Sequence, residues 1–254
     1  MERWLGHVAL VTGATAGIGE AIAEKLVEHG MKVIGLARRK ERLDALAKRL
    51  SSKNGKFYGF VGDVTIEKDI INAFDWTKQN VGPVSILVNN AGISIWGPLA
   101  SGETKNWRAI LDTNVLGVCI ATREAIKHMN ENDVDGQIIN INSIGGHRLP
   151  HRPVLNLYPP SKHALTALTE SLRRELAQSG SKIRVTSLSP GMVDTELRQA
   201  GTAEKRVDDS TYKALTMVPM LKSADVADAA VYILSTPTSV NIAELIIEPV
   251  GELI

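Results

Sequence analysis

The 254-residue sequence predicts one doubly wound α/β domain, built on a seven-stranded parallel sheet with helices on both faces. Two observations lead to this prediction. Short, almost wholly apolar runs alternate with segments whose apolar residues recur at helical spacing, as parallel strands and their crossover helices do. No linker, repeat or low-complexity segment interrupts the alternation, so we expect residues 1–254 to form a single unit.

The expected elements follow one another along the whole chain. Strands are expected at residues 7–12, 32–36, 57–62, 85–89, 137–142, 182–189 and 242–247. Helices are expected at residues 18–29, 42–50, 66–79, 106–129, 159–178 and 223–234. Residues 192–221 show no clear period. Loops of that length are usually functional, so this segment is predicted to be a substrate lid.

Composition and charge narrow the range of functions. Lys and Arg number 29 against 28 Asp and Glu, so no basic surplus favours a nucleic acid partner. No apolar run approaches the ~18 residues of a membrane span, and no signal peptide is visible at the N-terminus. Cys119 is the only cysteine, which fits a reducing compartment, and we expect it to be a small buried residue on a helix. We predict a cytoplasmic protein without a membrane span or a metal site.

A glycine cluster after the first strand predicts a dinucleotide site. Gly13, Gly17 and Gly19 stand between that strand and the first helix. A helix N-terminus offers unpaired N–H groups and partial positive charge to a pyrophosphate, and glycines let the backbone approach it. Glu20 and Ala21 follow where a P-loop needs Lys and Ser or Thr, which excludes that alternative. The spacing is a variant of the dinucleotide fingerprint, so a Rossmann-type fold is expected.

The end of the second strand indicates which dinucleotide is bound. Sites for NAD tend to place a carboxylate there, whereas an arginine accommodates the 2′-phosphate of NADP. This chain has Arg38, Arg39 and Lys40 instead of a carboxylate. A guanidinium binds phosphate through two parallel hydrogen bonds, so NADP(H) is predicted. The alternative is that these cations form a solvated start to the next helix.

Tyr158 and Lys162 are a candidate catalytic pair. Their spacing places both side chains on one face if they share a helix. A free phenol has a pKa of about 10, and an ammonium group nearby is expected to lower it. Ser143 offers a hydroxyl for the same substrate oxygen. Taken alone, the pair also fits an aromatic ring packed under a lysine stem.

Two prolines complicate this pair. Pro159 and Pro160 follow Tyr158 directly, and neither has an N–H group to donate. Proline is harmless in the first turn of a helix but breaks or kinks its interior. The shared face of Tyr158 and Lys162 therefore depends on where the helix begins.

Together these motifs resemble the short-chain dehydrogenase/reductase family over nearly the whole chain. The matching motifs are residues 12–19, 63–64, 89–92, 112–115 around Asn114, Ser143, Tyr158 with Lys162, and 190–191. Further segments resemble the NADP-dependent group that contains insect farnesol dehydrogenases and a vertebrate keto-steroid reductase. These are residues 1–4, 140–143, 146–148, 167–170 and 234–237.

The resemblance implies a role for each matching residue. The implied catalytic residues are Asn114, Ser143, Tyr158 and Lys162, with Asn114 holding a water in a proton relay. With the basic pair added, the expected cofactor contacts are Gly13, Thr15, Gly17, Ile18, Gly19, Arg38, Arg39, Asp63, Val64, Asn90, Gly92, Tyr158, Lys162, Pro190, Gly191, Val193 and Thr195. Asp63 and Val64 would contact the adenine, and residues 190–195 would wrap the nicotinamide amide. Asn89 and Asn114 also fit a strand-end turn and a satisfied helical amide.

The implied reaction is reversible hydride transfer between NADP(H) and an alcohol or carbonyl carbon of a lipophilic substrate. An isoprenoid alcohol such as farnesol and a steroid ketone are the substrates that the resemblance suggests. Apolar residues near the catalytic set agree with this, namely Leu149, Pro150, Pro153, Val154, Leu155, Leu157, Met217, Val218, Met220 and Leu221. The resemblance also suggests a homodimer or homotetramer formed through helices 106–129 and 159–178. The alternative is a cofactor-binding redox sensor or scaffold without turnover.

Overall fold

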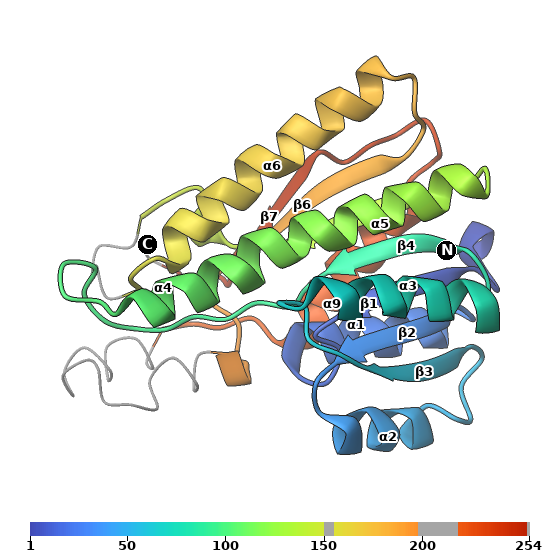
Figure 1. The fold of residues 1–254 in the computed structure, drawn as a ribbon, viewed down its shortest axis with the longest axis horizontal. Helices are drawn as coiled ribbons and strands as arrows, with labels where there is room; N and C mark the ends of the chain where they lie inside the picture. Colours follow the sequence, from blue (N-terminus) through green and yellow to red (C-terminus); the bar gives the residue numbers. More distant parts are fainter. Residues whose placement is uncertain (150–154, 198–217, 253–254) are drawn as a thin grey trace.

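The computed structural model describes residues 1–149, 155–197 and 218–252 and confirms the predicted parallel sheet (Figure 1). Its strands are β1 (Val8–Thr12), β2 (Lys32–Ala37), β3 (Lys56–Val61), β4 (Val84–Asn89), β5 (Gln137–Ile141), β6 (Arg184–Pro190) and β7 (Glu244–Ile247). They lie in the order β3-β2-β1-β4-β5-β6-β7, and every neighbouring pair is parallel. The order reverses between β1 and β4, which is where open α/β sheets bind ligands.

Helices cover both faces of the sheet. They are α1 (Gly17–Glu28), α2 (Lys40–Arg49), α3 (Glu67–Asn80), α4 (Thr104–Leu111), α5 (Gly117–Glu131), α6 (Tyr158–Gln178) and α9 (Ser223–Ser235). Figure 1 looks onto the layer of α3, α5 and α6, with α1 and α9 fainter behind the sheet. Ala9 and Val11 of β1 pack toward α1 and α9, whereas Val8 and Leu10 pack toward α3 and α5. This alternation follows from the two-residue period of a strand.

The helix predicted at residues 106–129 is one continuous helical run with a change of pitch inside it. Its central turn, η2 (Asp112–Leu116), is π-helical and separates α4 from α5. Single π-helical turns inside α-helices often occur at functional sites. Asn114 lies in this turn, and only 1% of its surface is exposed.

Helix α6 begins at Tyr158, so Pro159 and Pro160 occupy its first turn. The first N–H groups of a helix have no intrahelical partner, and the missing proline N–H groups therefore cost little there. The Ser161 N–H then donates to the Leu157 carbonyl at 3.0 Å. The condition set by the sequence is met, because Tyr158 and Lys162 share one helix.

The prediction that Cys119 is buried is wrong. The residue is exposed on α5, although its neighbours Val118 and Ile120 are both buried. The buried positions of α5 face the sheet and α3, and residue 119 falls on the opposite side of the helix. No helix in the described part of the chain is long and apolar enough to cross a membrane.

Candidate active site

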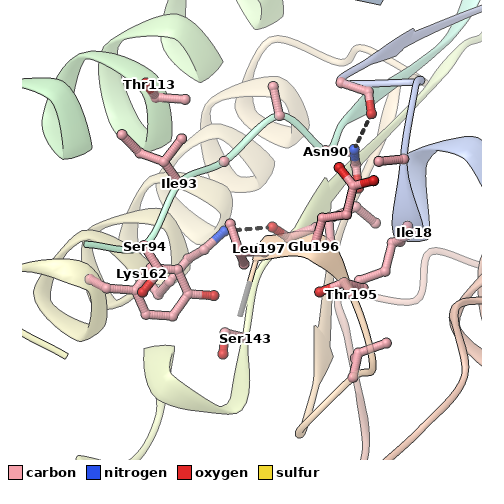
Figure 2. Close-up of a pocket in the computed structure, with 18 of the residues that line it drawn as sticks. Ile18, Asn90, Ile93, Ser94, Thr113, Ser143, Lys162, Thr195, Glu196 and Leu197 are labelled. Atoms are coloured by element: carbon pink, nitrogen blue, oxygen red, sulfur yellow. Dashed lines mark hydrogen bonds between the residues drawn. The ribbon is translucent and has the colours of Figure 1, made fainter. Parts of the chain in front are cut away.

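A cavity of about 1210 Å³ lies along the carboxyl ends of the strands. Residues one or two positions after the ends of six different strands line it, including Gly13, Arg38, Asp63, Asn90, Ser143 and Gly191. Figure 2 shows Ser143 and Lys162 on one side of this cavity and Ile18 and Thr195 on the other. Parallel strands end at one edge of the sheet, which brings together residues that are far apart in the sequence.

Nearly all of the predicted site residues line this cavity. They are Gly13, Thr15, Gly17, Ile18, Arg38, Arg39, Asp63, Val64, Asn90, Gly92, Ser143, Tyr158, Lys162, Pro190, Gly191, Val193 and Thr195. Gly19 and Asn114 instead lie behind the wall. A side chain at Gly19 would collide with the Asn90 amide and the Gly13 carbonyl, so this glycine allows α1 to pack closely on the turn.

The glycine turn is fastened to the end of β4. The Asn90 amide donates to the carbonyls of Thr12 at 2.9 Å and Gly13 at 3.2 Å. In return, the Thr12 hydroxyl accepts from the N–H groups of Asn90 and Ala91, both at 3.0 Å. Gly13 has a φ of +68°, which a residue with a side chain rarely adopts. The turn therefore holds a fixed shape with the N-terminus of α1 open to the cavity.

The two predicted phosphate ligands differ in their surroundings. The Arg38 side chain is 73% exposed and its guanidinium lies 3.5 Å from the Asp63 carboxylate. Arg39 is more constrained, because it donates to the Thr15 hydroxyl at 3.1 and 3.3 Å and pairs with Glu196 at 2.9 Å. Burial raises the pKa of Asp63, but hydrogen bonds from Thr65 and the charge of Arg38 bring it below its ordinary value.

Lys162 is a buried ammonium at the end of β5. Only 5% of its surface is exposed, and its Nζ donates to the Ile141 carbonyl at 2.8 Å. Burial penalises the charged form and lowers the pKa of Lys162 to about 8. The group is still mostly protonated at neutral pH.

The expected effect of Lys162 on Tyr158 is wrong for this structure. Burial raises the pKa of the Tyr158 phenol, and a hydrogen bond with Ser143 only partly offsets this. The Lys162 ammonium lies 5.8 Å from the centre of the tyrosine ring and is bonded to the Ile141 carbonyl instead of the phenol oxygen. Desolvation therefore exceeds any attraction between the two groups, and the phenol keeps its proton at neutral pH.

Asn114 joins two segments that border the cavity. Its side-chain oxygen accepts from the Ile93 N–H at 2.9 Å, and its amide donates to the Ile93 carbonyl at 3.0 Å. The same amide also donates to the Ser161 hydroxyl at 3.1 Å. Asn114 thus fixes the backbone after β4 against the start of α6.

Sequence reasoning missed several polar residues in the cavity wall, of which Ser94 and Glu252 are considered in turn. The Ser94 hydroxyl is buried and has no hydrogen-bond partner among the described residues. The Glu252 carboxylate reaches the wall from the C-terminal tail and accepts from the Met192 N–H, 60 residues earlier. Ser94 follows the recognised Asn-Asn-Ala-Gly motif and was within reach of sequence reasoning, whereas the tail carries no comparable signal.

The predicted apolar wall is present in part. Of the predicted residues, Leu155 and Val218 line the cavity, together with Trp96 and Met192, which were not predicted. Leu149, which is 68% exposed, does not line it, and neither do Leu157, Met220 and Leu221. Other residues predicted for this wall lie outside the described residues, namely Pro150, Pro153, Val154 and Met217.

Only the ends of the predicted lid are described. A parallel bridge joins Val193 to Leu221, with the Leu221 N–H donating to the Met192 carbonyl at 2.8 Å. The middle of the segment, residues 198–217, lies outside the described residues, so the lid remains a prediction. No group of three His, Cys, Asp or Glu side chains that could hold a metal ion occurs within the described ranges.

The chain belongs to the short chain dehydrogenase family, whose pattern matches residues 7–206. It is 43% identical to a farnesol dehydrogenase of Aedes aegypti over 99% of both chains. It is also 41% identical to dehydrogenase/reductase SDR family member 11 of Gallus gallus over the full length of both. Among solved structures, a serine dehydrogenase complexed with NADP+ is 32% identical with a TM-score of 0.84, covering 97% of this chain and 96% of that one. The predicted family is confirmed. The chain therefore belongs to a family of oxidoreductases with a Rossmann-type fold.

Proposed function

We propose that this protein is an NADP(H)-dependent enzyme that transfers a hydride between nicotinamide and an alcohol or carbonyl carbon of a lipophilic substrate. The observation that carries the proposal is the meeting of Ser143, Tyr158 and Lys162 in a cavity that also contains the glycine turn and two arginines. The names of the farnesol dehydrogenase relative and of the NADP+ complex among the solved structures support it.

A nicotinamide bound here would supply or accept the hydride, and the protein residues would transfer the proton and stabilise the charge. Because its phenol keeps its proton at neutral pH, Tyr158 donates that proton to the carbonyl oxygen during reduction. In the opposite direction the phenol first releases its proton to the relay, and the resulting phenolate then takes the proton of the alcohol. Ser143 orients the same oxygen and stabilises the charge that develops on it. The Lys162 ammonium, with a pKa of about 8, contributes a positive charge beside the reacting groups and holds the nicotinamide ribose. Asn114 acts by holding the backbone at Ile93 and by supporting a proton relay.

The glycine turn and the N-terminus of α1 would receive the pyrophosphate. Asp63 and Val64 would contact the adenine, and the arginines would bind the 2′-phosphate. Arg38 is the better candidate, since its guanidinium is more exposed than that of Arg39 and only weakly paired.

Arg38→Asp tests this assignment. We expect it to weaken the binding of NADPH by about 1.5–3 kcal/mol, which is the contribution of a hydrogen bond to a charged group. The binding of NADH should be nearly unchanged. Lys40→Asp is the matched control, since Lys40 carries the same charge but pairs with Asp44 at 2.6 Å. Equal weakening of both cofactors by Arg38→Asp would transfer the role to Arg39.

An apolar wall of Trp96, Leu155, Met192 and Val218 favours an isoprenoid alcohol such as farnesol, or a steroid or other lipophilic ketone. Met adapts to irregular apolar ligands. The decisive experiment follows NADPH absorbance with a panel of lipophilic ketones, and NADP+ reduction with the matching alcohols.

Tyr158→Phe should abolish turnover while NADPH binding stays intact. Activity of that variant above a few per cent of wild type would contradict the role of Tyr158.

We also propose a homodimer or homotetramer formed through the α4–α5 run and α6, in the cytoplasm. Exposed apolar side chains on these helices support the assembly, namely Leu111, Leu116 and Leu168. Leu116→Glu should reduce the mass measured by light scattering. An unchanged mass would place the contact elsewhere.

A further inference from the structure

The C-terminal tail forms part of the wall at the nicotinamide end of the cavity. The two carboxylate oxygens of Glu252 accept from the Met192 N–H at 3.0 and 3.2 Å. Glu252 also packs against Gly191 so closely that a side chain at that glycine would collide with the carboxylate. The Gly191 N–H donates to the Ile247 carbonyl at 2.7 Å. The end of β7 and the C-terminal tail (residues 248–252) therefore bind the N–H groups of residues 191 and 192 in turn.

Other contacts hold the two ends of the same segment. It follows β6 directly, and Pro190, which ends that strand, has no N–H to donate. On its far side, Val193 pairs with Leu221 through two hydrogen bonds. The Leu221 N–H donates to the Met192 carbonyl at 2.8 Å, and the Asp194 N–H donates to the Leu221 carbonyl at 3.0 Å. Glu252 thus fixes the N–H of Met192 exactly where the backbone leaves the sheet and turns along the cavity wall, and its own side chain lines that cavity.

The surroundings of the Glu252 carboxylate favour its protonated form more than water does. Burial raises the pKa of Glu252 above its ordinary value, and the nearby charge of Glu248 acts in the same direction. The Met192 N–H and the more distant Arg148 act in the opposite direction. Arg148 is itself paired with Glu248 at 3.2 Å.

We propose that Glu252 is a positioning residue, whose carboxylate holds the Met192 N–H and so keeps residues 190–193 in the shape that receives the nicotinamide half of the cofactor. This inference rests on the proposed function. The C-terminal tail thereby takes part in cofactor binding through Glu252, although no sequence motif indicates this role.

The test compares two ligands in wild type and in Glu252→Ala. NADPH spans the whole cofactor site, whereas adenosine 2′,5′-bisphosphate carries only its adenine half. We expect Glu252→Ala to raise the Kd of NADPH about tenfold, at the lower end of what a hydrogen bond to a charged group contributes. The Kd of the bisphosphate should not change. The control Glu248→Gln makes a similar change in the same tail and should alter neither Kd.

A conservative variant separates positioning from general damage. Glu252→Gln keeps the shape and one acceptor oxygen but cannot carry the charge, so its Kd for NADPH should lie between those of wild type and Glu252→Ala. As the pH falls, Glu252 becomes protonated, and the Kd of wild type for NADPH should approach that of Glu252→Gln. The difference between these two proteins is therefore largest at neutral pH and shrinks on acidification.

A second measurement addresses the contact with Gly191. Gly191→Ala should weaken NADPH in the wild-type background, because the new methyl group displaces the carboxylate. Its effect should be several-fold smaller in the Glu252→Ala background, where the carboxylate is gone and only the milder contact with Pro249 at 3.0 Å remains. Strict additivity of the two substitutions would overturn the proposal.

The outcomes are distinguishable from a failure of the proposed function. If wild type binds neither NADPH nor the bisphosphate, the proposed function is wrong. If wild type binds both and Glu252→Ala weakens both equally, or neither, then Glu252 does not position the nicotinamide segment.

Discussion

Replacing Lys162 by methionine is expected to stabilise the protein while it removes nearly all turnover. Methionine has a similar length and no charge, so it fills the buried site without the penalty of a desolvated ammonium. Lys162 lies with only 5% of its surface exposed and makes one hydrogen bond, to the Ile141 carbonyl. Under the proposed function, this position would serve chemistry at the expense of stability.

The magnitude follows from the pKa. Burial lowers the pKa of Lys162 from 10.5 to about 8, which corresponds to about 3 kcal/mol in favour of the neutral form. Losing the bond to Ile141 leaves a buried carbonyl without a partner, which costs about 1–3 kcal/mol. We expect a net gain of up to about 2 kcal/mol at pH 7, or a few degrees in Tm.

Urea unfolding over a range of pH provides the assay. The unfolded chain holds its Lys162 proton up to pH 10.5, whereas the folded chain releases it near pH 8. Between these values the unfolded state binds more protons, so wild type gains stability as the pH rises and the variant loses its advantage. Lys182→Met is the control, because Lys182 is 77% exposed and should show no such trend. A variant that is less stable than wild type at pH 7, or a difference that does not depend on pH, would refute the reasoning.

Three further variants test other parts of the site. Replacing Pro159 and Pro160 with Ser and Ala should leave turnover unchanged and lower Tm slightly, because the unfolded chain gains freedom; a joint rise in rate and Tm would contradict the first-turn placement. Gly19→Ala should destabilise the protein by about 1–3 kcal/mol in urea unfolding, since the methyl group meets the Asn90 amide. Normal stability of that variant would mean that α1 shifts at little cost. Ser94→Ala removes a hydroxyl without a partner among the described residues, so unfolding should be unchanged or slightly less favourable; a clear loss of stability would reveal a partner.

The sequence by itself determined the sheet, the order of its elements and most of the cavity wall. Each strand and helix carries its own period within a few residues, and the parallel order then places the residues after each strand at one edge. That is why Gly13 and Arg38 could be assigned before any contact was known, whereas the assignment of Asn90 came from the family resemblance. The first-turn position of Pro159 was also within reach, since it depends only on where a helix starts.

Tertiary structure decided what depends on contacts between distant segments. The sequence places Tyr158 beside Lys162, but the sign of the change in the pKa of Tyr158 depends on how far burial exceeds the attraction of the ammonium. Gly19 looks like a phosphate ligand until its neighbour Asn90 is seen. Glu252 meets Met192, 60 residues earlier, only because β6 and β7 are parallel and end side by side. Periodicity is a local property of the sequence. Desolvation and close packing depend instead on all the neighbours of a residue, which only the folded chain brings together.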